Sequence, residues 1–434
     1  MKNNNISRLI TTAKELLGSF GLFSNVTLLV FLKYMMESPE KIGNGVIDYK
    51  NIYEFRKAFD LTRAGKKTLS SQDFELLLDS VGFVGKATTT AFFFHDLSFE
   101  YERLFSGSKT QLVLANAVND FELPDNPDSM KQFFETVLAF SYGDVRRTGE
   151  HITNKSLRTL VSKILNVQNH DSYMDCFCGY SSMLLSINEY EVYYGFDVDY
   201  TSFYVSVMME LLLGKRTSNV VCGDFLGYPT EGMATKLFSD APIGFKISPS
   251  ASVMPEYYDI SKDLSITAFY KALDSLCEEG VGVFTVPAKT LTSVSKSYCD
   301  LRKKLAESGL KAVIELPPMW AGTNIQTNLL VVQKGYTGKI TFVSAADAAV
   351  KTKDRSVTML SDESIDKILN SINGGANIEN YSVNVDRRDV ICANTFALSK
   401  YMTPQSTIVE YRSVEDIDEE LNELYARLHK NLNK

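Results

Sequence analysis

Three aspartates near the ends of successive apolar runs have the spacing of a nucleotide-binding site. Asp175, Asp197 and Asp224 each close or follow a short apolar run that is typical of a buried strand. If these strands are parallel, the three carboxylates meet at one edge of a sheet, where open α/β sheets bind ligands. Asp197 is then the candidate for ribose hydroxyls. Asp224 is the candidate for the amine of an adenine ring.

Two of these acids also have ordinary structural interpretations, and both stay open at this point. Asp197 could cap the helix that follows it, because Asp is favoured at helix N-termini. Asp224 could be a turn residue. The turn after Asp175 contains one glycine, Gly179, whose lack of a side chain lets a ligand approach the backbone.

A fourth carboxylate stands at the start of another loop. The apolar residues 237–238 lead into Ser239, Asp240, Ala241 and Pro242, and a glycine-containing loop follows. This pattern predicts the end of a parallel strand that presents a carboxylate and backbone carbonyls at the same edge of the sheet.

The elements that must position these residues alternate between strand and helix from about residue 146. Strands are expected at 173–177, 191–197, 219–222, 236–243, 281–287, 311–316 and 328–333. Helices at 200–213, 266–279 and 297–308 separate several of them. The alternation predicts an α/β fold with a Rossmann-like, doubly wound and mainly parallel sheet. Residues 340–405 are mixed, and short strands and helices packed beside the sheet are expected there.

Helices are expected before and after that α/β domain, which spans residues 146–405. Residues 1–145 form a predicted helical N-terminal domain. In residues 406–434, apolar side chains between 417 and 428 have a 4-3-4 spacing, which predicts an amphipathic helix. This C-terminal helix either docks on its own domain or is a partner-binding arm of a hetero- or homo-oligomer.

Composition limits the classes of function. The net charge of −8 argues against a chain that coats nucleic acid by itself. The most apolar run, 28–32, is far shorter than a membrane span, and the N-terminus has no secretory signal. A cytoplasmic protein without a membrane partner is therefore expected. Six scattered cysteines and four dispersed histidines predict reduced thiols and no metal site.

In order and spacing, these motifs resemble those of the modification (M) subunit of type I restriction-modification systems, the adenine-N6 DNA methylases. Residues 149–153 resemble the family's G-E-(F/H)-(Y/F)-T-P motif, 175–182 resemble D-P-A-C-G-S-G-G, and 240–243 resemble N-P-P-F. The segment 315–325 closely resembles L-P-P-x-x-F-x-G-T-x-I, and 394–399 resembles N-x-x-x-L-S. The resemblance covers most of the chain.

The resemblance implies a methyltransferase fold that binds S-adenosylmethionine across the carboxyl edge of the sheet. The implied contacts of this cofactor are Thr153, Asp175, Gly179, Asp197 and Asp224. The target adenine is flipped out of the duplex. Asp240 and the backbone at Ala241 and Pro242 would hold its amine, and an aromatic residue would stack on the base. Ile243 stands at that aromatic position, and Phe245 is the candidate replacement.

Each chemical motif departs from the family's pattern. Ile152 and Asn154 replace the aromatic residue and the proline of the first motif. Residues 175–182, called the cofactor turn below, correspond to the family's D-P-A-C-G-S-G-G motif. In this turn Tyr180 and Ser181 replace a serine and a glycine of the motif. A non-glycine residue is strained by about 1–3 kcal/mol if its position requires a positive φ. Loss of base stacking at Ile243 removes about 1–3 kcal/mol.

Two functions therefore stay open. In the first, the chain transfers a methyl group from S-adenosylmethionine to adenine N6 in DNA. A DNA-specificity subunit then reads the sequence, and a restriction subunit is a further partner. In the second, the chain is a catalytically inactive methyltransferase-fold protein that serves as a structural or DNA-clamp subunit of a restriction or defence complex. The four acids favour the first function, and the altered motifs favour the second.

Overall fold

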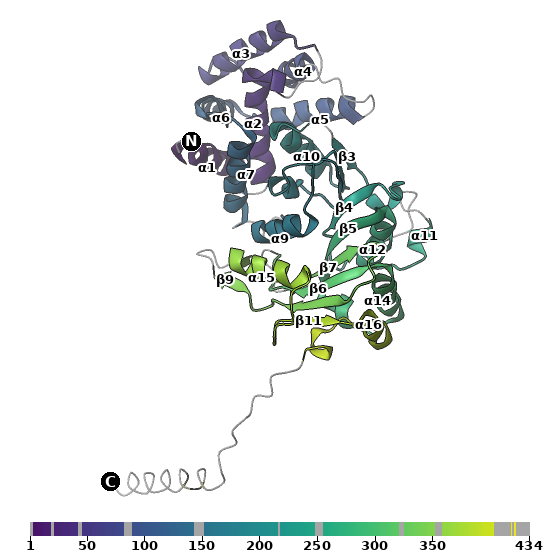
Figure 1. Ribbon diagram of the computed structural model, residues 1–434. Coiled ribbons are helices and arrows are strands. Elements are labelled where there is room, and N and C mark those ends of the chain that lie inside the picture. The colour runs from purple at the N-terminus through teal and green to yellow at the C-terminus, as the bar shows by residue number, and fades with distance from the viewer. Residues whose placement is uncertain are drawn as a thin grey trace, which may run out of the picture.

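The computed structural model contains a group of helices followed by a large sheet with helices on both faces (Figure 1). It describes residues 3–18, 21–41, 46–81, 89–142, 152–215, 218–247, 255–320, 325–351, 358–402, 418 and 421. The helices of the first group are α1 (Asn3–Leu17), α2 (Leu22–Glu37), α3 (Tyr49–Arg63), α4 (Ser71–Ser80), α5 (Thr89–Leu104), α6 (Ser108–Asp120) and α7 (Pro127–Tyr142).

The α2 helix lies at the centre of this group because it has no polar face. Fifteen of its sixteen residues are buried, and it packs against α1, α3, α6 and α7. It also packs against α10 (Tyr200–Leu212), which belongs to the sheet region. The buried Lys33 amine donates to the carbonyls of Val118 and Asn119 at the end of α6, at 2.9 and 2.6 Å. These bonds compensate the burial of its charge.

No single described helix is both long and apolar enough to cross a membrane. Ile6–Leu17 and Leu22–Glu37 reach that length and composition only when the two helices are counted together, and they are bent by 120°.

Nine strands form one sheet in the order β11-β8-β6-β7-β5-β4-β1-β2-β3. Their bounds are β1 Ser172–Asp175, β2 Val192–Asp197, β3 Ser218–Cys222, β4 Ala234–Ser239, β5 Leu276–Pro287, β6 Leu310–Glu315, β7 Thr327–Gln333, β8 Ile340–Ser344 and β11 Ser382–Val385. The run β3-β2-β1-β4-β5 is entirely parallel, whereas β7 is antiparallel to both of its neighbours. A separate hairpin joins β9 (Ala349–Lys351) to β10 (Thr358–Leu360).

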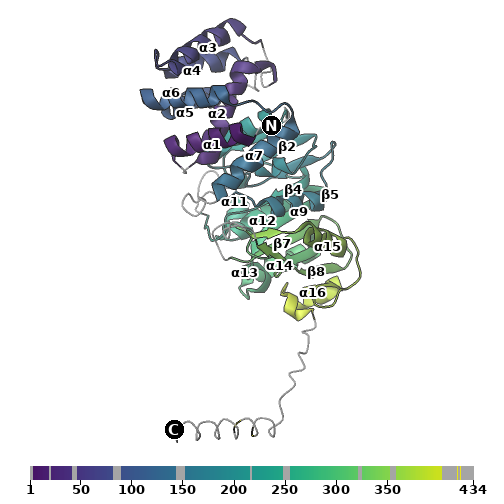
Figure 2. The ribbon, with the colours of Figure 1, turned by 90° about the vertical axis from the view of Figure 1, so that its left-hand side faces the viewer.

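Helices cover both faces of the sheet (Figure 2). The helices α9 (Lys155–Leu165), α10 and α15 (Asp362–Ile372) pack on one face, where α2 and α7 join the same core. The helices α12 (Leu264–Ser275), α14 (Lys296–Ser308) and α16 (Arg387–Ala393) pack on the other face. Because side chains alternate along a strand, a sheet covered on both faces needs strands that are apolar throughout. This is why the strands read as continuous apolar runs in the sequence.

The predicted α/β fold with its doubly wound sheet is confirmed, and all seven predicted strands are present as β1 to β7. The helix predicted at 266–279 was too long, since β5 already begins at Leu276. The strands β8 and β11 extend the sheet, whereas the sequence predicted short elements packed beside it. The predicted domain boundaries near 145 and 405 lie outside the described residues and stay predictions. The same holds for the helix at 406–434, apart from residues 418 and 421.

Candidate functional site

The four aspartates lie at one edge of the sheet. Asp175 and Asp197 are the last residues of β1 and β2, while Asp224 and Asp240 follow β3 and β4 directly or within two residues. These four strands are parallel neighbours, so their carboxyl ends share an edge. The chain proceeds from β1 outward to β2 and β3, and from β4 in the opposite direction to β5. The β1–β4 pair is therefore the switch point at which such sheets bind ligands.

Asp175 is buried at this switch point. Its carboxylate accepts the backbone N–H of Phe177 at 3.4 Å and the hydroxyl of Tyr173 at 3.5 Å. The pKa of Asp175 is raised to about 8, chiefly by burial and with help from the charges of Asp240 and Asp197, while the two hydrogen bonds oppose the shift. Asp175 is therefore largely protonated near neutral pH.

The turn after β1 adopts the left-handed backbone conformation at two positions. Gly179 has φ of 50° and Ser181 has φ of 53°. The serine thus occupies a position that favours glycine, as the sequence comparison had suggested. Its buried hydroxyl forms a 2.8 Å hydrogen bond with the hydroxyl of Tyr193. Tyr180, between them, stacks on Phe23 of α2 with ring centroids 5.3 Å apart.

Asp197 faces the same turn. Its carboxylate accepts the N–H of Gly179 at 3.0 Å and the N–H of Asp199 at 2.8 Å. Asp199, and not Asp197, caps α10 by accepting the N–H of Ser202 at 2.7 Å. Burial raises the pKa of Asp197, and the backbone hydrogen bonds oppose that shift. Between the two acids, Val198 is 71% exposed and gives this edge an apolar surface that the sequence analysis missed.

Asp224 has a local structural role at the end of β3. Its carboxylate accepts the N–H of Leu226 at 3.0 Å and caps the short helix η3 (Phe225–Gly227). This matches the turn-aspartate interpretation, although the residue still lies at the predicted edge. Phe225 is buried and contacts the ring of Phe177 edge-on at 6.0 Å, so aromatic packing connects this corner to the turn after β1.

Asp240 is half-buried and is held by side chains from two other segments. Its Oδ1 accepts the hydroxyl of Thr285 in β5 and the indole N–H of Trp320, the latter at 3.3 Å. Trp320 lies in the connection between β6 and β7. Met319, beside it, donates its N–H to the Thr327 hydroxyl at 3.0 Å, which fixes the connection to β7.

The loop after Asp240 presents an exposed aromatic ring. Ala241 is buried, Pro242 and Ile243 are half-buried, and the side chain of Phe245 is 61% exposed. The backbone of this loop is fixed, because the carbonyl of Phe245 accepts the N–H of Leu264 at 3.1 Å. Phe245 thus stands two residues after Ile243 on an anchored loop and points out of the core.

The residues of the first motif lie at the start of α9. Thr153 is half-buried there, and Asn154 caps α9 by accepting the N–H of Ser156 at 2.9 Å. The Asn154 amide also donates to the carbonyl of Thr358 in β10 at 2.6 Å. Asparagine therefore replaces the family's proline with a cap and a tertiary contact. Residues 149–151 of this motif lie outside the described residues.

Comparison with known proteins identifies the family. The model of the N-6 DNA Methylase family matches residues 125–408, well over half of the chain. This chain belongs to the N-6 DNA methylase family. The resemblance predicted from the sequence is thereby confirmed. No curated protein sequence matches the chain.

Two solved structures share the fold of this N-6 DNA methylase. The type I restriction-modification system methyltransferase subunit from Streptococcus thermophilus aligns with a TM-score of 0.72 at 17% identity, covering 90% of this chain and 97% of that one. A chain from a structure of complex assembly and conformational transition in the type I R-M system aligns with a TM-score of 0.64 at 14% identity, covering 99% and 96%. At such identities the likeness shows the fold alone.

The edge of this methylase is locally open beside Gly179. A Cβ atom built on Gly179 would meet nothing within 4 Å, so the turn is open to close approach of a ligand. The half-buried carboxylate of Asp197 and the exposed Val198 flank the same edge. A backbone open to close approach at Gly179, a carboxylate acceptor at Asp197 and an apolar surface at Val198 fit an adenosyl group. Among the described residues, no group of three or more His, Cys, Asp or Glu side chains could hold a metal ion.

Trp320 and Thr285, like Val198, are residues of this candidate site that sequence reasoning missed. Trp320 is the only tryptophan of the chain and lies within the 315–325 segment on which the resemblance rested, which was a usable signal. Thr285 gave no such signal, because its role depends on the register of β5 against β4, where Ser239 pairs with Phe284. Residues 321–324 of the late segment lie outside the described residues.

Proposed function

We propose that this chain is the modification subunit of a type I restriction-modification system and methylates adenine N6 in DNA. The observation that supports the proposal most directly is Asp240, an acceptor at the carboxyl end of β4 whose orientation is set by Thr285 and Trp320. It stands at the β1–β4 switch point, beside the turn with open space at Gly179.

The cofactor in this proposal is S-adenosylmethionine, whose sulfonium carries the methyl group that is transferred. Asp197 would accept hydrogen bonds from ribose hydroxyls, and Val198 would contact the adenine ring of the cofactor. The backbone at Gly179 would lie against the methionine part, and Thr153 and Asp175 would be the further contacts that the family's motifs imply. Asp224 would contribute indirectly, because it caps η3 and so fixes the backbone that follows β3 at this edge.

The target base would be held by the loop after β4. Asp240 would accept one N–H of the adenine amine and the carbonyl of Ala241 the other, while Pro242 restricts the backbone that follows. Accepting from the amine keeps electron density on nitrogen and fixes its direction, so these residues act by alignment and electrostatics. Phe245 would stack on the flipped base in place of an aromatic residue at Ile243.

Partners would supply the sequence specificity. A net charge of −8 is poorly suited to holding DNA alone, so a DNA-specificity subunit would provide much of the DNA contact. A restriction subunit would complete the system. The segment 406–434 would dock on a partner through its apolar seam, which includes Leu421, a helical residue that is 43% exposed.

The test is transfer of a tritiated methyl group to DNA by the chain in complex with its DNA-reading partner. Transfer that disappears in Asp240→Ala, while that variant still binds S-adenosylmethionine in calorimetry, would support the proposal. Absence of any transfer from the intact wild-type complex would refute it.

A second candidate function is favoured by specific residues of the cofactor turn. Tyr180 is bulky, Ser181 occupies a left-handed position, and Ile243 cannot stack as an aromatic ring would. These features support an inactive methyltransferase-fold subunit that contributes structure or DNA clamping to a restriction complex. Calorimetry separates the two functions, since micromolar binding of S-adenosylmethionine by the wild type would exclude a closed pocket.

A further inference from the structure

Arg158 in α9 is fully buried and connects three separate segments of the chain. One guanidinium nitrogen donates to the carbonyl of Ser182 at 2.9 Å, at the start of η2 (Ser182–Leu185). Another donates to both carboxylate oxygens of Glu135 in α7, at 3.0 and 2.9 Å. Arg158 thus joins the N-terminal helices to the residue that ends the cofactor turn.

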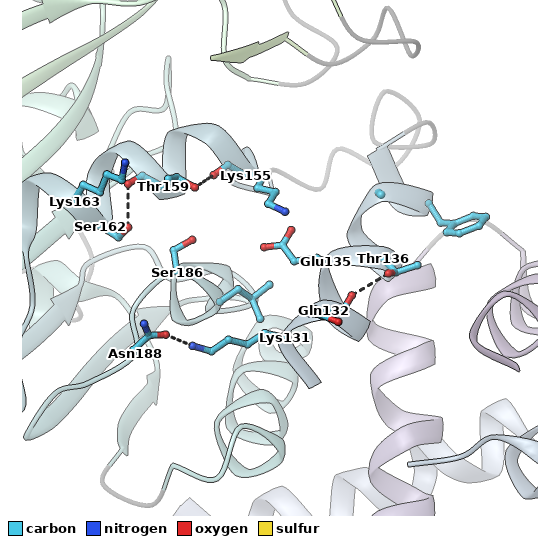
Figure 3. Close-up of a pocket in the computed structure, with 13 residues that line it drawn as sticks. Lys131, Gln132, Glu135, Thr136, Lys155, Thr159, Ser162, Lys163, Ser186 and Asn188 are labelled. Atoms are coloured by element: carbon cyan, nitrogen blue, oxygen red, sulfur yellow. Dashed lines mark hydrogen bonds between the residues drawn. The ribbon is translucent and has the colours of Figure 1, made fainter. Parts of the chain in front are cut away.

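The carboxylate of Glu135 remains in contact with solvent. Its side chain is 20% exposed, whereas that of Arg158 is fully buried. Glu135 lines a cavity of about 720 Å³ between α7 and α9. Figure 3 shows Lys155 pointing toward Glu135. Removing the partner of a buried cation strongly destabilises a fold, because the charge is left uncompensated. Glu135 therefore stabilises Arg158 in its buried position. A shift of α7 would therefore be transmitted through Glu135 and Arg158 to the backbone at Ser182.

The rest of the cofactor turn is held by side chains as well. Ser206 of α10 donates to the carbonyl of Gly179 at 2.7 Å. Tyr193 of β2 bonds the hydroxyl of Ser181, and Asp197 accepts the N–H of Gly179. These contacts stabilise a turn that has lost two of the family's glycines. Unlike these three side chains, Arg158 also bonds to an N-terminal helix, through Glu135 of α7.

A second contact between the N-terminal helices and the same turn is independent of the first. Tyr180 stacks on Phe23 of α2, with ring planes 23° apart. Phe23 is itself fully buried in the core of the helices, where it also contacts Phe134 of α7 at 5.8 Å. Both Tyr180 and Ser182 are therefore fixed by helices that precede the sheet in the chain.

We propose that Arg158 and Glu135 are positioning residues through which the N-terminal helices set the geometry of the cofactor turn, and hence the affinity for S-adenosylmethionine. The proposal rests on the proposed use of that cofactor. Loss of Arg158 frees the carbonyl of Ser182 and relaxes the turn next to Ser181, while the residues at the far side of the edge keep their contacts.

The experiment compares Arg158→Met, Glu135→Gln and Arg158→Lys in the full-length chain. Calorimetry with S-adenosylmethionine gives the affinity, and hydrogen exchange without cofactor reports on residues 176–186. Hydrogen bonds to charged groups predict that Arg158→Met weakens binding by about 10- to 100-fold. Exchange of the turn should become faster. Arg158→Lys should recover part of the affinity, and Glu135→Gln should show an intermediate loss.

Arg302→Met is the matched control. Arg302 is another buried arginine that donates to backbone carbonyls, those of Thr290, Ser293 and Asn394, but it lies in α14 on the opposite face of the sheet. Its replacement should destabilise the fold while leaving exchange at 176–186 and cofactor affinity in the folded fraction unchanged. A general effect of losing a buried cation would appear in both variants.

The outcomes separate this inference from the proposed function. A wild type that binds no cofactor refutes the proposed function. The inference is then decided by hydrogen exchange at residues 176–186, compared between the wild type and Arg158→Met. Unchanged exchange and unchanged affinity in Arg158→Met overturn it. If Arg158→Met does not fold, Glu135→Gln and Arg158→Lys decide, and wild-type values in both overturn it as well.

Discussion

The indole N–H of Trp320 donates to Oδ1 of Asp240 across 3.3 Å and joins the connection after β6 to the loop after β4. Thr285 of β5 donates to the same oxygen. Two donors from different segments fix the rotation of the Asp240 carboxylate. This hydrogen-bond acceptor at the β1–β4 switch point is therefore held in one orientation. The late segment of the chain, far from the cofactor turn in sequence, thereby contributes to the same site.

Replacing the indole of Trp320 with a phenyl ring, which is smaller and has no N–H donor, should affect methyl transfer more than cofactor binding. In Trp320→Phe a ring remains, but Asp240 loses a donor, and a hydrogen bond to a charged group contributes about 1.5–3 kcal/mol. Transfer to DNA by the partner complex should therefore fall by about 10- to 100-fold. Calorimetric affinity for S-adenosylmethionine should stay within about twofold, because independent sites affect one another by only about 0.3–0.5 kcal/mol. An equal fall in affinity would show that Trp320 acts on the cofactor side.

Asparagine should be tolerated at position 240, whereas alanine should not. Asp240→Asn keeps an Oδ1 that can accept from both Thr285 and Trp320. Asp240→Ala leaves those donors without their acceptor and removes the proposed contact to the target amine. We expect Asp240→Asn to retain transfer within about tenfold and Asp240→Ala to lose about 100-fold or more. Similar losses in the two variants would mean that the charge of Asp240, rather than its direction, matters.

The exposed ring of Phe245 should contribute to DNA binding. Base–aromatic stacking contributes about 1–3 kcal/mol, so Phe245→Ala should weaken DNA binding by the partner complex by about 5- to 100-fold. The 61% exposure of the side chain predicts that the fold itself is little affected. Val294 is 93% exposed and lies outside the loop, so Val294→Ala is the control. Equal DNA affinity in the wild type and in Phe245→Ala would exclude stacking by this ring.

The sequence predicted the backbone of this molecule better than the contacts of its side chains. The strands β1 to β7 were predicted because a sheet covered on both faces requires continuous apolar runs. The shared edge of the four aspartates followed from parallel strand order alone. The α3 helix lies within residues 1–145, which were predicted to be helical as a whole, and its buried Ile52, Phe55 and Phe59 have helical spacing.

Contacts between distant side chains were beyond sequence reasoning. The Arg158–Glu135 pair spans 23 residues and the Trp320–Asp240 pair 80 residues, and neither periodicity nor strand order brings such partners together. The strain at Ser181 was predicted from the motif, whereas its compensation by Tyr193 depends on the pairing of β1 with β2. Sequence thus indicated which residues share the edge of the sheet, and tertiary packing determines which side chains support them.

Removing the hydroxyl of Tyr193 should destabilise the fold through the cofactor turn. Tyr193→Phe leaves the buried Ser181 hydroxyl without its 2.8 Å partner, which costs about 1–3 kcal/mol. Urea unfolding should show this loss, while Tyr336→Phe, at an exposed hydroxyl, should lose less than about 0.5 kcal/mol. In a Ser181→Gly background the cost of Tyr193→Phe should shrink, because glycine needs no partner and adopts positive φ freely. An undiminished cost there would place the effect elsewhere.

The buried carboxyl of Asp175 should make stability depend on pH in a defined window. Its pKa is raised to about 8 in the fold, by burial first and by Asp240 and Asp197 next, whereas an unfolded aspartate titrates near 4. The folded chain therefore binds this proton more tightly. Its contribution to stability is fully present below about pH 4 and is lost as pH rises toward 8, by at most about 1.4 kcal/mol per pH unit. Above that window the contribution no longer changes.

Asp175→Asn isolates this contribution, because the amide resembles the protonated acid and does not titrate. Other ionisable groups are present in both proteins, so their effects cancel in the difference between the two unfolding free energies. That difference should move in favour of the variant as urea unfolding is repeated from pH 5 to pH 8, and should level off at higher pH. A difference that is constant over the whole range would show that Asp175 is ionised in the folded chain. The hydrogen bonds from Phe177 and Tyr173 would then outweigh its burial.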